Sequence, residues 1–517
     1  MKAPGTGTET VADGPSFLRH RWMHVVVAGV TVITAAVYVR ALGVGLYSDD
    51  YTWAAKMAPT LERPWYVLSV FGRDLNPVLH LSLLLDWLTS HGAAWSLHAS
   101  SLAVHLACTA LLAVLLWQLQ QRRQMAPLPT WTASWIAGVT ALTWSLNVQL
   151  SEAVIWPAAR GHALATLWLL GALVCLQAGS GLPVVGGLLV LALMSKETAL
   201  FALPLLPLLA PRDRRRPTAW LVGGVGGAFV LLIVATKPGT GMSHEGIGAL
   251  LLKAPYILLR PTGLASFYGF SVLELLVWTA AGAGLVVLLR KRRIAVAGLA
   301  WVVLTTLPIV LLPKVSSRYL YLPAVGYALL MADLLGLAAR QRSSPGFRRL
   351  AGGLFGLLLA VVLSADAIHV QKEMTDYGLL AAPYEACLRA LEGPVQALKP
   401  HESLVVLDAS PRDAHVRLAR TVAERGTMLK LIPLRERAVG GLIYLDDAIN
   451  ILKPRAPGLL GSRGILQAPA EVHVVVYDGT TTRELDVSGR LPEPLGRLPR
   501  FAASWGPAER YFEQHHQ

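Results

Sequence analysis

Charged side chains lie at the edges of long apolar runs in this 517-residue chain. A charge at membrane depth is costly unless it is paired or faces water, so each is a candidate for function. The candidates are Asp49, Asp50, Arg73, Asp74, Asn76, His80, Asp86, Glu152, Arg160, Lys196, Glu197, Arg260 and Arg318. Such a set suits transfer from a phosphate-containing donor. A carboxylate takes a proton from an attacking hydroxyl, and Arg or Lys holds the phosphate leaving group.

The expected donor is linked to a lipid. The sequence contains no Gly-rich phosphate loop of the P-loop or dinucleotide type, which argues against a soluble nucleotide. A polyprenyl tail would instead occupy a groove between helices. The three cysteines, Cys108, Cys175 and Cys387, are too far apart for a disulfide framework or metal cluster. The sequence offers only carboxylates as possible metal ligands, so we predict that no metal or other cofactor is essential, and a divalent cation stays the open alternative.

Composition sets the protein class. Hydrophobic residues make up 54% of the chain, charged residues make up 15%, and the mean hydropathy is +0.49. Ordinary soluble proteins carry about 25% charged residues. This composition excludes a soluble globular protein and a disordered one. The chain is predicted to be a polytopic α-helical membrane protein.

The net charge of +14 reports topology. Much of the excess lies in four arginine-rich segments between apolar runs, at 122–123, 212–216, 290–293 and 340–349. Short basic loops mark the cytoplasmic side of a membrane. The charge therefore does not indicate a nucleic-acid partner.

Eleven apolar stretches are candidate spans of a bilayer that needs about 20 residues per helix. They run from about 23–44, 95–118, 130–147, 160–178, 182–195, 198–210, 218–236, 271–289, 294–312, 322–339 and 350–367. Residues 1–22 are expected in the cytoplasm because Arg19 and Arg21 precede the first span. Alternation then places all four basic segments inside and everything after the last span outside.

Three outer segments follow from this topology. Residues 48–94 include an apolar stretch at 78–87 that is too short to span, which predicts re-entrant or interfacial helices. Residues 237–270 form a second large outer loop within the 23–367 transmembrane domain. For 368–517 we predict a small mixed α/β domain outside the cytoplasm, with strands at 404–408 and 472–477 and helices at 417–425 and 434–449.

Other interpretations of the same residues stay open. Asp49 and Asp50 could simply be polar residues that end a span and face water. Lys196 and Glu197 could form an ordinary surface pair, although the apolar runs on both sides favour the functional interpretation. Arg318 with Tyr319 and Tyr321 is equally an interfacial anchor. The spacing of His98 and His105 favours packed polar groups over metal ligands.

The order of several short motifs resembles a known family. They are Ser48-Asp49-Asp50-Tyr51, residues 73–80 leading to Leu85-Asp86-Trp87, Ser96-Leu97-His98 with His105, residues 149–156 with Arg160-Gly161, Ser195-Lys196-Glu197-Thr198-Ala199, and residues 317–323. Over roughly 20–340 the chain resembles GT-C glycosyltransferases of the protein O-mannosyltransferase type. The resemblance extends to the transmembrane members that carry TPR repeats and to their bacterial relatives. The tail departs from these, since it shows no 34-residue period.

The resemblance implies about eleven spans, a catalytic acid in the first outer loop and a polyprenyl-phosphate sugar donor. Asp49 or Asp50 would then be the base, with Asp49 favoured and Asp50 positioning the acceptor or sharing the role. The implied residues for donor phosphate or sugar are Arg73, His80, Glu152, Arg160, Lys196, Glu197, Arg260, Arg318, Tyr319 and Tyr321.

The predicted function is an inverting glycosyltransferase. It would move a hexose, with mannose favoured, from a polyprenyl monophosphate to a protein hydroxyl or a cell-envelope glycan or lipid. The predicted location is a bacterial inner membrane with a periplasmic tail, and the endoplasmic reticulum stays the alternative. The alternatives are a transporter or flippase of lipid-linked sugar and an inactive scaffold that binds partners through its outer domain.

Overall fold

The computed structural model describes residues 16–46, 50, 76–90, 93–122, 128–236, 292–310, 316–340 and 345–397, together with short strands between 402 and 485. The chain divides into two compact units. The first unit comprises Met1–Val39, Ala103–Ser151 and His162–Val370, and the second comprises Arg40–Leu102, Glu152–Gly161 and Gln371–Gln517.

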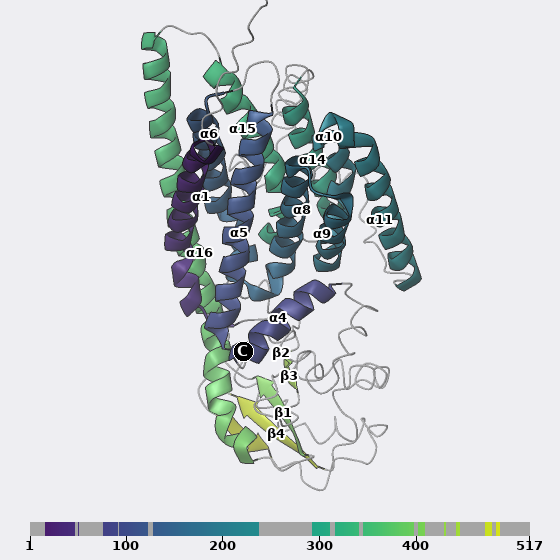
Figure 1. Cartoon of the computed structure of the whole chain (residues 1–517). Helices are drawn as coiled ribbons and strands as arrows, with labels where there is room; N and C mark the ends of the chain where they lie inside the picture. Colours follow the sequence, from purple (N-terminus) through teal and green to yellow (C-terminus); the bar gives the residue numbers. More distant parts are fainter. Residues whose placement is uncertain are drawn as a thin grey trace, which may run out of the picture. The chain divides into compact units, whose positions relative to one another are not determined.

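The first unit is a helical bundle (Figure 1). Its helices are α1 (Ser16–Tyr38), α5 (Ala94–Gln121, which begins in the second unit), α6 (Thr130–Leu146), α8 (Arg160–Ala178), α9 (Leu182–Ser195), α10 (Leu206–Leu209), α11 (Arg215–Thr236), α14 (Arg293–Val310), α15 (Pro323–Arg340) and α16 (Pro345–Ala397). Short 3-10 turns join them: η3 (Val148–Leu150), η5 (Glu197–Leu205), η6 (Arg212–Arg214) and η8 (Ser317–Leu320).

Seven described helices are long and apolar enough to cross a membrane. They coincide with the spans predicted at 23–44, 95–118, 160–178, 218–236, 294–312, 322–339 and 350–367. Two further predicted spans, at 182–195 and 198–210, match shorter apolar helical segments. The span predicted at 130–147 corresponds to α6, which has 17 residues. The span predicted at 271–289 lies outside the described residues. An integral membrane protein is therefore supported, while the count of eleven stays a prediction.

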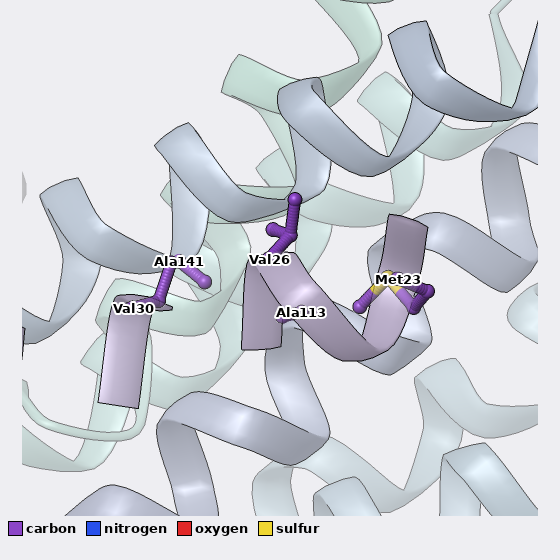
Figure 2. Close-up of a cluster of buried hydrophobic side chains, with 5 residues drawn as sticks. All are labelled: Met23, Val26, Val30, Ala113 and Ala141. Carbon is purple, nitrogen blue, oxygen red and sulfur yellow. The ribbon is translucent and has the colours of Figure 1, made fainter. Parts of the chain in front are cut away.

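An apolar cluster joins α1 to the bundle. Met23, Val26 and Val30 recur every three to four residues, so they share one face of α1, and they pack with Ala113 of α5 and Ala141 of α6 (Figure 2). The two small alanines let the α1 side chains approach the neighbouring backbones closely. This contact fixes the helix that leads to the Asp49–Asp50 segment.

Helices α14 and α15 cross with their backbones in close approach. A Cβ added to Gly298 would lie 2.7 Å from the Gly326 carbonyl oxygen, and one added to Gly326 would lie 2.5 Å from the Gly298 oxygen. Glycine is thus the residue that fits both positions.

Replacing Gly298 with valine should separate the two helices and lower the free energy of unfolding by about 1–3 kcal/mol, the usual cost of overpacking. Gly353 of α16 is the matched control, because nothing lies within 4 Å of a Cβ built there. Thermal unfolding in detergent measures both. Equal melting temperatures for Gly298→Val and Gly353→Val would show that the close approach is absent.

Polar side chains join several helix ends at one face of the first unit. Arg122 at the end of α5 donates to the Gln177 carbonyl near the end of α8. Gln177 in turn donates to the Leu209 carbonyl at the end of α10 (2.6 Å). Arg340 at the end of α15 lies 3.4 Å from the Gln120 side chain of α5.

The beginnings of two helices meet the same face. Arg214, next to the start of α11, donates to the carbonyls of Gly179 (2.6 Å) and Ser180, where α8 ends. Arg293, at the start of α14, donates to the Ala210 carbonyl (2.9 Å). Gly179 has a φ of 86°, the left-handed conformation in which many helices stop.

The alternating topology predicts this arrangement, because spans two, four, six and ten would end on the side where spans seven and nine begin. Cations near helix C-termini are also favourable to the helix dipole. The basic segments therefore cap helix ends, in addition to indicating one side of the membrane. Assigning this face to the cytoplasm remains a prediction.

The second unit contains η1 (Val39–Gly43), α4 (Pro77–Ser90), the first turns of α5, α7 (Glu152–Ile155), η4 (Pro157–Ala159) and the far part of α16. Helix α4 covers the apolar stretch at 78–87 that was predicted to be a short helix. Helix α16 continues to Ala397, with an apolar part from Gly352 to Ala382, so the helix extends past residue 367, where the last span was predicted to end. No proline or glycine pair interrupts it near 367, which explains the continuation.

The tail contains a five-stranded sheet in the order β2-β3-β1-β4-β5. The strands are β1 (Glu402–Asp408), β2 (Leu429–Lys430), β3 (Gly441–Tyr444), β4 (Glu471–Tyr477) and β5 (Thr482–Leu485). Strand β1 pairs in parallel with β3 and β4, and the two edge strands are antiparallel.

The two strands predicted at 404–408 and 472–477 coincide with β1 and β4. The helix predicted at 434–449 is wrong where β3 lies, because the Gly-Gly pair before Leu442-Ile443-Tyr444 favours a strand with β-branched and aromatic residues. The helix predicted at 417–425 lies outside the described residues, and the α/β domain as a whole stays a prediction.

Candidate functional site

The described site residues are distributed over both units. The second unit holds Asp50, Asn76, His80, Asp86, Glu152 and Arg160, and the first unit holds Lys196, Glu197, Arg318, Tyr319 and Tyr321. Asp49, Arg73, Asp74 and Arg260 lie outside the described residues.

Arg160 is the centre of the group in the second unit. Its side chain is fully buried, and its Nη1 donates to the Asp86 carboxylate (2.6 Å) and to the Ser82 hydroxyl (2.7 Å). Its Nε donates to the Ser101 hydroxyl (2.9 Å), and its Nη2 donates to the Leu97 carbonyl (2.5 Å). Ser100 donates to the other Asp86 oxygen.

Helical spacing explains how these partners converge. Ser82 and Asp86 are four residues apart on α4, and Leu97 and Ser101 are four apart on α5, so each helix presents one pair on one face. Four of the five N–H groups of Arg160 are engaged in this network. That engagement favours a role in joining α4, α5 and α8 over the phosphate-binding role suggested by the resemblance.

Asp50 is a second buried acid in this unit, with 5% of its surface exposed. Its Oδ1 accepts a hydrogen bond from the Ala158 backbone N–H (2.8 Å) in η4. On either side of Ala158, Trp156 and Ala159 pack against Ala381 of α16. The orientation of the Asp50 carboxylate therefore depends on a backbone segment that α16 supports. Glu152 and His80 are also buried.

The group in the first unit brings together residues from three elements. Lys196 lies at the break between α9 and η5, in extended backbone, and its Nζ is 3.4 Å from Glu197 Oε1. Arg318 of η8 lies with its Cζ 5.1 Å from the centre of the Tyr319 ring, a cation–π distance. We use the name cation group for five residues: Lys196, Glu197, Arg318, Tyr319 and His162.

His162 links these elements, and sequence reasoning missed it. Its ring stands edge-on to Tyr319, with 5.1 Å between centroids and 89° between planes. Lys196 and Arg318 both act on it electrostatically. The sequence feature that could have indicated His162 is its position two residues after Arg160, within the first turn of α8.

Tyr321 belongs to a different, fully buried network. Its hydroxyl lies 2.7 Å from His105 Nδ1, and His105 Nε2 lies 3.1 Å from the Ser145 carbonyl. A carbonyl only accepts, so the Nε2 carries the proton and a neutral ring accepts the Tyr321 hydroxyl at Nδ1. Trp144 stacks on the same ring. These contacts agree with a packed polar role for His105, and the donor-binding role of Tyr321 stays a prediction.

The donor set suits anions better than a metal. Among the described residues, no group of three or more His, Cys, Asp or Glu is arranged to hold a metal ion. The expectation that no metal is required stays a prediction.

A comparison with known protein families gives no match, and neither does a comparison with curated proteins. Two solved structures show an overall similarity, both of ArnT from Cupriavidus metallidurans. The form bound to undecaprenyl phosphate has a TM-score of 0.45 and 12% identity over 91% of this chain and 99% of that chain. The apo form has a TM-score of 0.44 and 13% identity over 90% of this chain and 97% of that chain. At these values the similarity supports no conclusion about activity.

Proposed function

We propose that this protein is an inverting glycosyltransferase that moves a hexose, with mannose favoured, from a polyprenyl monophosphate. The acceptor is a protein hydroxyl or a cell-envelope glycan or lipid on the outer face of a bacterial inner membrane. The N-terminus is cytoplasmic and the tail is periplasmic in this proposal.

One observation carries the proposal: the cation group lies in a bundle of helices apolar enough to cross a membrane. Lys196 and Arg318 act on one buried ring, and both are cations suited to a phosphate leaving group. A lipid-linked donor is the phosphate ester that a membrane-embedded site would receive. Glu197 adds a carboxylate able to accept hydrogen bonds from sugar hydroxyls.

The base is assigned to the Asp49–Asp50 pair. Asp49 is the favoured base, and Asp50, held by the Ala158 N–H, orients the acceptor or shares the role. The hydroxyl attacks the anomeric carbon, its proton passes to the carboxylate, and the polyprenyl phosphate leaves with the bonding electron pair. The step inverts the anomeric configuration because attack and departure are on opposite sides.

Replacing Lys196 with alanine should raise the KM for the donor by about 10–100-fold, because a charge-assisted contact to phosphate is lost. Radiolabelled mannosyl and glucosyl polyprenyl phosphates measure this with purified protein. Lys372→Ala is the matched control, since Lys372 is an exposed lysine of α16. An unchanged KM in Lys196→Ala would remove Lys196 from the donor site.

The second class of function is transport of a lipid-linked sugar without chemistry. It shares the cation group but needs no base. Translocation in liposomes by a protein that transfers no sugar would replace the proposed function with this one.

A further inference from the structure

His162 has the properties of a ligand-binding residue and no other assigned role. The residue is buried, with 5% of its surface exposed. Among the described residues, none hydrogen-bonds to its ring nitrogens. A buried polar group normally has a hydrogen-bond partner. The ring is thus a candidate donor to a bound molecule.

The charges around the ring indicate the class of that molecule. Lys196 and Arg318 act on His162 from two different elements, and the Lys196 ammonium also pairs with Glu197. Lys196 and Arg318 are both cations, and cationic side chains bind the oxygens of a phosphate group.

We infer that His162 donates an N–H to the phosphate of the lipid-linked donor, between Lys196 and Arg318. An imidazole ring carries at least one N–H donor whether neutral or protonated, so the bond forms in either state. The edge-on contact with Tyr319 fixes the plane of the ring and hence the direction of the donor. This inference rests on the proposed function for the identity of the phosphate.

A purely structural role for His162 predicts a different result from a phosphate-binding one. Loss of packing would weaken binding of every lipid that enters the bundle. Loss of a phosphate contact would weaken binding of a phosphorylated lipid only. A pair of probes that differ by the phosphate alone therefore separates the two roles.

The experiment measures affinities for a polyprenyl monophosphate and for the polyprenyl alcohol of equal length, using the purified full chain in detergent. For His162→Phe we expect about a tenfold or greater loss of affinity for the phosphate and no change for the alcohol. His162→Gln keeps an N–H donor and should stay within about threefold of wild type. His369→Phe, an exposed histidine of α16, is the control.

An unchanged phosphate-to-alcohol ratio in His162→Phe would overturn the inference, as would a wild type that binds the two probes equally. Should the Phe variant fail to fold, His162→Met replaces it as a variant without a donor. Sugar transfer by the wild type is measured in parallel. A protein that prefers the phosphate through His162 but transfers no sugar would support this site and overturn the proposed transferase.

Discussion

Replacing Asp49 with asparagine should lower kcat for sugar transfer by about 10²–10⁴-fold, the usual contribution of a general base. The amide cannot take the proton of the acceptor hydroxyl, whereas its size is nearly unchanged. Donor affinity should persist, because the phosphate contacts belong to the cation group. The measurement is steady-state transfer from a radiolabelled donor, with donor binding measured on the same sample.

The neighbouring acid gives a graded comparison. Asp50→Asn keeps an oxygen that accepts the Ala158 N–H, so a role limited to orientation predicts a smaller loss of kcat than Asp49→Asn. Asp213→Asn, at an exposed acid near the start of α11, is the control. Full activity in both Asp49→Asn and Asp50→Asn would contradict the mechanism.

Replacing Arg160 with methionine should cost about 3–5 kcal/mol of the free energy of unfolding, because Asp86 would remain buried without its cation. Asp86 has 4% of its surface exposed and Arg160 has none, so water cannot solvate the remaining charge. The serines and the Leu97 carbonyl would lose their donor as well. We expect a protein that unfolds at a lower temperature in detergent.

A double-mutant cycle tests whether this loss of stability comes from breaking the pair of Asp86 and Arg160. Asp86→Leu combined with Arg160→Met should be more stable than either single variant, because the double variant buries no unpaired charge. Arg40→Met is the control, since Arg40 bonds Gln371 at an exposed site and its loss should cost about 0.5 kcal/mol or less. Additive effects of the two single changes would show that Asp86 and Arg160 do not form a pair.

Patterns with a strong physical cause could be predicted from the sequence. The length of the apolar stretches predicted the helices at 23–44 and 95–118, because a helix needs a minimum number of apolar residues to cross a bilayer. The basic segments gave the alternation, and the joined ends of α5 and α8 agree with it. The β1 and β4 strands could be predicted from short runs rich in valine.

Pairing between distant residues could not be predicted. Sequence indicated that Arg160 must be satisfied, but not that α4 and α5 would supply four acceptor atoms. The surroundings of His162 could not be predicted either, because they come from η8 and the α9–η5 break. The length of α16 was underestimated because the helix continues past its most apolar part.

The most direct test of the central claim combines two assays on one proteoliposome preparation, with a radiolabelled mannosyl polyprenyl phosphate and periplasmic proteins and lipids as acceptors. One assay measures label joined to acceptor, and the other measures movement of the donor between leaflets. The account predicts acceptor-bound label in the wild type that is lost in Asp49→Asn. Movement of the donor between leaflets, with no transfer in the wild type from the mannosyl or the glucosyl donor, would contradict it.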